Sequence, residues 1–258
     1  MEFTSAINPL DEIGNQLQGV LNSRTRSGYP GIGSYIEMNG VTSLKASTQP
    51  LIVLDGVPID MQYGRTYLHD GFYNDVLTNI NPNDVEDVKV ISNGTVLYGA
   101  KGSNGVIEIT TRRNKTMATR IEASANVGVE LIPVTYDVMS ATQYKNYAAA
   151  LIGTMDTKTK SFRFLQPYMK NGIANAYYNK YQANTDWGDE VYRNAVTQRY
   201  AFSVSGGGDV ANYMLSVGYT RANSTLKENN LNRLNIRFNT DVKLANIVNV
   251  RFDASYNL

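Results

Sequence analysis

VNVRFDASYN, at residues 248–257, alternates apolar and polar side chains without interruption. Successive side chains of a β-strand point to opposite faces of a sheet, so Val250 and Phe252 share one face while Arg251 lies on the other. Four other segments alternate in the same way, with Met214 as the exception on a polar face, and they cover residues 121–131, 200–205, 212–220 and 234–239. Segments of about ten residues with this period, separated by turns, are typical of transmembrane β-barrels, which face lipid with their apolar side and water with their polar side.

The connections between these segments also alternate in length. Two are tight, at residues 206–211 and 244–246, and two are longer, at residues 132–197 and 222–232. Outer-membrane barrels join antiparallel strands by short periplasmic turns and longer extracellular loops. The first strand should therefore rise from the periplasm, which leaves the N-terminal half of the chain on the periplasmic side or inside the barrel. Within the longest connection, Ser140 and Gln143 predict a capped helix that ends near Gly153.

The composition excludes several classes of function. Lys and Arg total 24 and Asp and Glu total 23, whereas a nucleic-acid binder would carry a strong basic excess. The sequence has no cysteine and one histidine, so it offers no disulfide framework, no thiolate metal site and almost no material for a Ser-His-Asp triad. No apolar run approaches the ~20 residues of a transmembrane helix. No signal peptide begins at Met1, so we expect that a leader was removed or that the chain is cut from a longer one.

The N-terminal half, up to about residue 116, follows a different pattern. Short apolar or β-branched runs predict strands at residues 51–55, 88–91 and 106–111. Asn81 before Pro82 predicts the start of a short helix. The glycines at residues 98–105 fit neither the Rossmann nor the Walker spacing, so they indicate a turn between strands instead of a phosphate-binding loop. We therefore expect a compact mixed α/β unit that ends at the basic residues 112–115.

Six stretches of the sequence resemble the SusC/RagA family of TonB-linked outer-membrane transporters. Three of them resemble the plug domain of that family: PLIVLDGVPI at residues 50–59, NPNDVE at residues 81–86 and YGAKGSNGVI at residues 98–107. Three others resemble the approach to its barrel and the barrel strands: NTDW at residues 184–187, FSVSGG at residues 202–207 and RLNIRFN at residues 233–239. The chain departs from the family pattern at residues 36–40 and 90–97, and a TonB-contacting box is not visible in it.

The resemblance implies a fold with two parts. Residues 1–116 would form a mixed α/β TonB-dependent receptor plug domain. Residues 117–258 would form the N-terminal part of an antiparallel transmembrane β-barrel, with five strands that are too few to close it. Plugged outer-membrane transporters have about 22 strands. The chain would thus be a fragment of such a transporter.

The resemblance also implies a cellular setting. It places the chain in the outer membrane of a Gram-negative cell, in contact with the lipid bilayer. The partners that it implies are a SusD-like surface lipoprotein and the TonB complex, and the cargo that it implies is an oligosaccharide or a peptide. It implies no enzymatic activity, no cofactor and no nucleic-acid partner.

One alternative function stays open, a surface-binding or adhesion module whose β-rich half forms a soluble sandwich. A sandwich packs one face of each sheet and solvates the other, whereas a barrel needs a continuous lipid-facing band. If the barrel interpretation holds, an arginine should be costly at Val217, Val250 or Phe252. An arginine should be mild at Ser255 or Asn239, which are on the lumen side.

Candidates for ligand contact lie in an aromatic and polar stretch that follows a predicted strand. They are Tyr63, Tyr67, His69, Phe72 and Tyr73. Aromatic side chains combine an apolar body with a polar tip, which suits a sugar or a peptide, and a plain surface loop has the same composition. We predict no metal site, because the acidic residues 186–190 lack the order of an EF-hand loop. We predict no catalytic residue, because nothing places carboxylates such as Asp55 and Asp60 in a shared cleft.

Overall fold

The computed structural model describes residues 6–16, 22–24, 29–59, 67–69, 72–73, 76–134, 136–164, 183–244 and 247–258. The chain divides into two compact units. One unit combines Met1–Leu131 with Asn194–Leu258, and the other is Ile132–Arg193.

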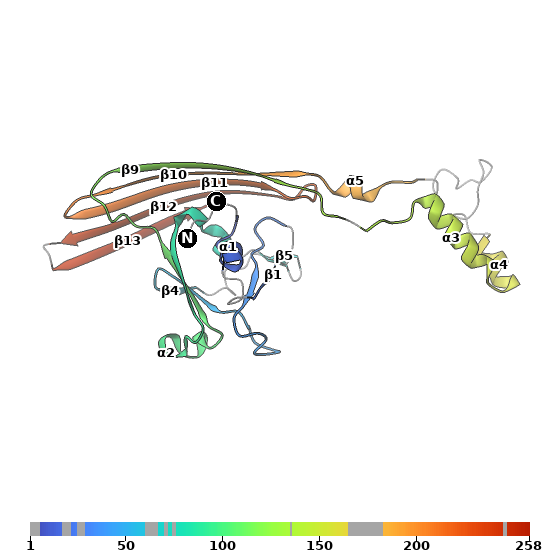
Figure 1. The fold of residues 1–258 in the computed structure, drawn as a ribbon, viewed down its shortest axis with the longest axis horizontal. Helices are drawn as coiled ribbons and strands as arrows, with labels where there is room; N and C mark the ends of the chain where they lie inside the picture. Colours follow the sequence, from blue (N-terminus) through green and yellow to red (C-terminus); the bar gives the residue numbers. More distant parts are fainter. Residues whose placement is uncertain are drawn as a thin grey trace. The chain divides into compact units, whose positions relative to one another are not determined.

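A five-stranded antiparallel sheet forms one layer of the first unit (Figure 1). In spatial order its strands are β13 (Val248–Asn257), β12 (Asn230–Leu244), β11 (Ala211–Asn223), β10 (Ala195–Gly207) and β9 (Arg120–Glu130). Each strand pairs with its neighbour along the chain, and Phe202 lies opposite Val217, which in turn lies opposite Ile236. The register therefore aligns the predicted apolar faces, and the predicted antiparallel strands are confirmed.

The two faces of this sheet are the reverse of those in a water-soluble protein. Its buried side chains are largely polar, each at most 9% exposed: Thr197, Arg199, Ser216, Thr220, Arg233, Asn235 and Asn239. Its exposed side chains include many large apolar ones, among them Tyr200, Phe202, Val250, Phe252 and Tyr256. Soluble domains bury apolar surface in preference to charged and amide groups. An exposed apolar face on long paired strands is the arrangement expected where that face contacts lipid.

Residues 6–116 of the first unit, called here the plug region, pack against the polar face of the sheet. Their own four-stranded sheet has the order β4 (Val57–Ile59), β3 (Leu51–Leu54), β8 (Val106–Thr111) and β7 (Val85–Ile91). Strands β3 and β8 are parallel, and the other two pairs are antiparallel. The predicted combination of a mixed α/β region with following antiparallel strands is thus confirmed.

The plug region has nine further elements among its described residues. They are α1 (Pro9–Gln16), β1 (Asn22–Arg24), β2 (Tyr35–Glu37), β5 (Tyr67–His69), β6 (Phe72–Tyr73), η1 (Val76–Asn79), η2 (Pro82–Asp84), α2 (Thr95–Tyr98) and η3 (Gly99–Gly102). A buried apolar cluster joins several of them to the sheet: Leu10, Ile13, Ile36, Ile52, Leu77, Ile80, Val85, Ile107 and Ile109. Burial of such side chains is the main stabilising term for a small domain.

Two local predictions for the plug region are confirmed in detail. Asn81 caps η2 by accepting a hydrogen bond from the Asn83 amide, 3.1 Å away, and Pro82 occupies the first helical position. The glycine-rich turn connects β7 to β8 through α2 and η3. A Cβ atom on Gly102 would approach the Gly94 carbonyl oxygen to 2.6 Å, so the close packing of the turn on itself requires glycine there.

The second unit contains three helices among its described residues. They are α3 (Ala141–Gly153), α4 (Thr157–Phe164) and α5 (Trp187–Val191). Ser140 and Gln143 form the predicted capping box at the start of α3. Asp186 caps α5 by accepting hydrogen bonds from the amides of Gly188 and Asp189. In the part of the chain that the structure describes, no helix is long and apolar enough to cross a membrane.

Candidate functional site

The candidate site is the interface between the plug region and the polar face of the five-stranded sheet. Strand β12 contributes most to it, because successive side chains on its polar face each bond to the plug region. These side chains are Arg233, Asn235, Arg237, Asn239 and Asp241. They follow one another at every second position, as the alternation of a β-strand requires.

Two arginines of the sheet hold the beginning of the plug region through its backbone. Arg233, which is 3% exposed, donates from both terminal nitrogens to the carbonyl oxygen of Ile7 at 3.2 Å, and it also donates to the carbonyl oxygen of Thr78. Arg199 on β10 donates to the carbonyl oxygen of Ala6. Hydrogen bonds from charged donors are stronger than neutral ones. Residues 6–7 and η1 are therefore fastened to the sheet by side chains that bind backbone atoms.

Two asparagines of β12 continue this pattern. Asn235 donates to the carbonyl oxygen of Asn79 at 2.6 Å, and Asn239 donates to the carbonyl oxygen of Arg112 at 3.0 Å. The two asparagines are 4% and 2% exposed. Asn239 was expected from the sequence to tolerate an arginine as a lumen-side residue, but it is buried against the plug region, so that expectation is wrong.

Ion pairs also join the plug region to the sheet beside Asn239. Arg237 lies 3.5 Å from the carboxylate of Asp55, and both side chains are largely buried. The same carboxylate accepts hydrogen bonds of 2.8 Å from the amide and the hydroxyl of Thr111. Arg113, at the end of the plug region, pairs with Asp241 on β12 at 3.0 Å and with Asp253 on β13. An arginine that bridges two carboxylates fixes geometry more firmly than an isolated surface pair.

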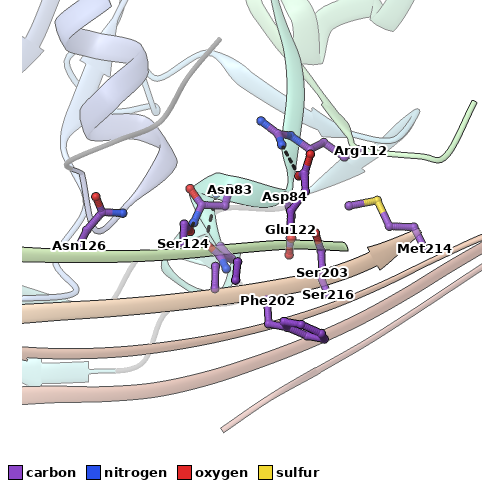
Figure 2. Close-up of a pocket in the computed structure, with 13 residues that line it drawn as sticks. Asn83, Asp84, Arg112, Glu122, Ser124, Asn126, Phe202, Ser203, Met214 and Ser216 are labelled. Atoms are coloured by element: carbon purple, nitrogen blue, oxygen red, sulfur yellow. Dashed lines mark hydrogen bonds and ion pairs between the residues drawn. The ribbon is translucent and has the colours of Figure 1, made fainter. Parts of the chain in front are cut away.

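A polar cavity of about 360 Å³ lies between η2 and strands β9, β10 and β11 (Figure 2). The plug region lines it with Asn81, Asn83, Asp84 and Arg112, and the sheet lines it chiefly with Glu122, Ser124, Asn126, Ser203 and Ser216. Figure 2 shows the Phe202 ring on the opposite side of the strands from η2. The plug region therefore presents amide and charged groups to the cavity, and the sheet presents hydroxyl, amide and charged groups.

Asp84 is the most buried charged group of this cavity, at 5% exposed. Burial raises the pKa of its carboxyl above the ordinary value of 3.8. A hydrogen bond from Ser216 and the nearby guanidinium groups of Arg237, Arg112 and Arg233 oppose that rise in pKa. Burial has the larger effect, so the protonated form of Asp84 is favoured relative to an exposed aspartate.

The ligand-contact residues proposed from the sequence lie elsewhere. Tyr63 lies outside the described residues. Tyr67 and His69 belong to β5, and Phe72 and Tyr73 belong to β6; the two strands pair with Tyr67 opposite Tyr73 and His69 opposite Phe72. The structure thus brings these four positions together in one hairpin, while the directions of their side chains lie outside what it describes. Their role as ligand contacts stays a prediction.

The sequence carries a further signal for this interface. Charged and amide residues recur on the polar face of β12. A water-filled lumen would solvate such residues, but once they are buried each of them needs a hydrogen-bond or charge partner from the protein. Arg233, Asn235 and Asn239 carry this signal. Their spacing predicts an inward face, but it does not predict which of them a second layer covers.

Comparison with known proteins agrees with this architecture. Residues 5–106 match the family described as the TonB-dependent Receptor Plug Domain. The TonB-dependent receptor SusC of Bacteroides thetaiotaomicron is 33% identical over 244 residues, which cover 92% of this chain and 21% of that relative. A TonB-dependent receptor of Formosa agariphila is 26% identical over 230 residues, which cover 88% of this chain and 19% of that relative. The chain spans about a fifth of the length of these relatives.

Solved structures show the same arrangement of strands and plug. The RagAB peptide transporter matches with a TM-score of 0.73 and 25% sequence identity, over 98% of this chain and 29% of that chain. The siderophore receptor PirA of Acinetobacter baumannii matches with a TM-score of 0.55 and 16% identity, over 97% of this chain and 29% of that chain. The second likeness concerns the fold alone.

The fold and its interface define a TonB-dependent receptor plug domain with the adjoining strands of an outer-membrane β-barrel. Within that class, the chain is similar to the SusC/RagA family of TonB-linked outer-membrane transporters in sequence and in fold. The predicted location in the outer membrane is confirmed by this family. The relatives are receptors and transporters, which confirms the prediction that the chain is not an enzyme.

Proposed function

We propose that this chain supplies the plug and the first wall strands of a receptor that imports oligosaccharides or peptides across the outer membrane. The observation that carries the proposal is the reversal of the sheet: its apolar face is exposed, and its polar face is bonded to the plug region. A soluble adhesion sandwich would bury the apolar face instead. The proposed partners are a SusD-like lipoprotein at the cell surface and the TonB complex.

The polar interface suits a plug that must move when cargo passes. Its contacts are hydrogen bonds and ion pairs, such as Asn235 to the Asn79 carbonyl and Arg237 to Asp55. Water can replace contacts of this kind when the two surfaces separate, whereas separation of two apolar surfaces would expose them to water at a cost of about 25 cal/mol per Å². The plug can therefore be held in place and still be displaced by a pulling partner.

The proposal assigns a role to each part of the sequence. Residues 1–116 act as the plug, and residues 117–258 begin the barrel. Tyr63 and the β5–β6 hairpin, with Tyr67, His69, Phe72 and Tyr73, contact the cargo. The support for the last role is the gathering of three aromatic residues and a histidine in one short hairpin.

A chimeric receptor tests the proposal. The matching region of SusC from Bacteroides thetaiotaomicron is replaced by this chain, and cells that lack the native receptor are given labelled oligosaccharides or labelled peptides. We expect uptake of one of the two solutes, lost when the energy-coupling TonB protein is removed. Binding of solute to the cell surface without uptake would instead support the adhesion alternative. Pull-down of the chimeric receptor with a SusD-like lipoprotein tests the proposed surface partner.

A further inference from the structure

The face of the five-stranded sheet that turns away from the plug region, called here the outward face, carries one charged side chain along the described lengths of β9 to β13. That side chain is Arg221, near the end of the central strand β11. It is exposed, and it shares its face with Val217 and Tyr219. No ion pair joins Arg221 to a carboxylate of the described residues. The charge of Arg221 is therefore available to an anion from outside the chain.

Arg221 lies in a row of hydrogen-bond donors. Its direct neighbours across the strands are Gln198 on β10 and Asn232 on β12. Side chains directly opposite one another on one face of a sheet have Cβ atoms about 4.5–5.5 Å apart, so the three can reach one small anionic group. The guanidinium group donates in a fork that fits phosphate, and both amides donate as well. We call Gln198, Arg221 and Asn232 the donor row.

The donor row borders the apolar band of the outward face. Toward the tight turn between β10 and β11, the next outward row pairs Tyr200 with Tyr219, and the row after it pairs Phe202 with Val217. Tyrosine is common where a transmembrane strand passes from the hydrocarbon to the headgroups. Arg221 thus lies one row beyond an aromatic border.

The length of β11 gives the same depth for Arg221. Strand β11 begins at Ala211, directly after the tight turn whose shortness predicts the periplasmic side, and Arg221 comes ten residues later. Ten residues of antiparallel strand span about 34 Å, which is about 26 Å along the barrel axis for a tilt of about 40°. The apolar band of an outer-membrane barrel is about 25 Å tall. Arg221 is therefore at the level of the outer-leaflet headgroups and outside the hydrocarbon.

We propose that the donor row binds the phosphate group of a lipid headgroup in the outer leaflet of the outer membrane. Arg221 supplies the charge, and the amides of Gln198 and Asn232 donate to the remaining phosphate oxygens. The acyl chains of the same lipid lie along the apolar rows that begin at Tyr219, where each buried methylene adds to the affinity. Strands β10, β11 and β12 are each paired on both sides, so the sheet itself fixes the spacing of the row. The site goes beyond import, because it holds the barrel wall at one depth in the membrane whatever the solute.

A photoreactive lipid tests the site in the chimeric receptor, purified in maltoside micelles that contain no phosphate. The probe carries a diazirine group beside a headgroup phosphate, and a matched probe has a hydroxyl group in place of the phosphate. After illumination, mass spectrometry measures the yield of cross-links to residues 195–234 per folded receptor. We expect the phosphate probe to label this segment at least fivefold more than the hydroxyl probe. Equal labelling by the two probes would overturn the proposal.

Substitutions assign the labelling to the donor row. Arg221→Gln removes the charge and should lower the yield of the phosphate probe at least fivefold. The matched control is Lys243→Gln, which removes the same charge from an exposed residue at the far end of β12 and should change the yield less than twofold. Asn232→Asp is a second, nearly isosteric variant; it places a carboxylate opposite Arg221, so it should also lower the yield at least fivefold. Equal yields from Arg221→Gln and Lys243→Gln, or full labelling of Asn232→Asp, would contradict the site.

Two further results distinguish a lipid from a free anion, and the site from the proposed function. Inorganic phosphate at the concentration of the probe should leave the yield within twofold, because a free anion lacks the acyl chains that lie along the sheet. Competition at this concentration would show that a free anion occupies the row, and it would overturn the assignment to a lipid. A chimeric receptor that imports neither solute and is still labelled as expected would refute the proposed function and support the lipid site.

Discussion

Arg233 is the residue whose replacement tests the attachment of the plug most sharply. Its buried guanidinium donates to the carbonyl oxygens of Ile7 and Thr78, which lie in separate segments of the plug region. Hydrogen bonds to charged groups contribute about 1.5–3 kcal/mol each. Arg233→Met keeps much of the side-chain volume and removes both attachments. Because water partly replaces the lost hydrogen bonds, we expect the free energy that holds residues 6–7 and η1 on the sheet to fall by about 2–4 kcal/mol.

Amide hydrogen exchange measures this loss directly. A change of 1.4 kcal/mol is tenfold in an equilibrium constant, so exchange in α1 and η1 should accelerate by roughly 30- to 700-fold in the chimeric receptor. Arg221→Met is the matched control, because Arg221 lies on the neighbouring strand β11 and is exposed. The control should change exchange by less than about threefold, which corresponds to the ~0.5 kcal/mol typical of surface substitutions. Equal exchange in the two variants would refute the role of Arg233.

Three other predictions concern the plug region. Gly218→Ala should destabilise the docking of the plug region on the sheet by about 1–3 kcal/mol, because the new Cβ would overlap the side-chain amide of Asn81. The control Gly128→Ala has nothing within 4 Å of its new Cβ and should be nearly neutral in urea unfolding. Similar free-energy costs for the two variants would contradict this packing. Burial raises the pKa of Asp84, so the folded state holds the proton of this carboxyl more tightly than the unfolded state. The free energy of unfolding should therefore fall as pH rises above about 3.8, and Asp84→Asn should remove that fall. An unchanged pH dependence in the variant would contradict this role of Asp84. Residues 1–116 expressed alone should be soluble and unfold cooperatively, and a chain without protected amides would show that they depend on the sheet.

The alternation of side chains was sufficient to predict the five strands and their faces. Period-two patterns are strong where one face of a strand meets lipid and the other meets polar groups, as in residues 248–257. The capped starts of η2 at Asn81 and of α3 at Ser140 were predictable for a similar reason, because the capping side chain and the helix it caps are adjacent in sequence.

The partners of the inward residues were not predictable in this way. Arg233 contacts Ile7 and Thr78, which are 226 and 155 residues away in the chain. A pattern with period two states that Asn239 faces inward, and it carries no information on whether water or the plug region fills the space there. The positions of such contacts follow from the docking of one layer on another, which depends on the shapes of both.

The central claim is that one face of the sheet contacts lipid and the other holds the plug. Tryptophan placed on strand β13 of the chimeric receptor, in membranes that contain brominated lipid, measures it most directly. Phe252→Trp lies on the apolar face, so its fluorescence should be strongly quenched by the bromine atoms, whereas Ser255→Trp on the opposite face should be quenched little. The signal of the unsubstituted chimeric receptor, which includes Trp187, is subtracted in both cases. Equal quenching at the two positions, or stronger quenching at residue 255, would contradict the assignment of the faces and the transporter fold that rests on it.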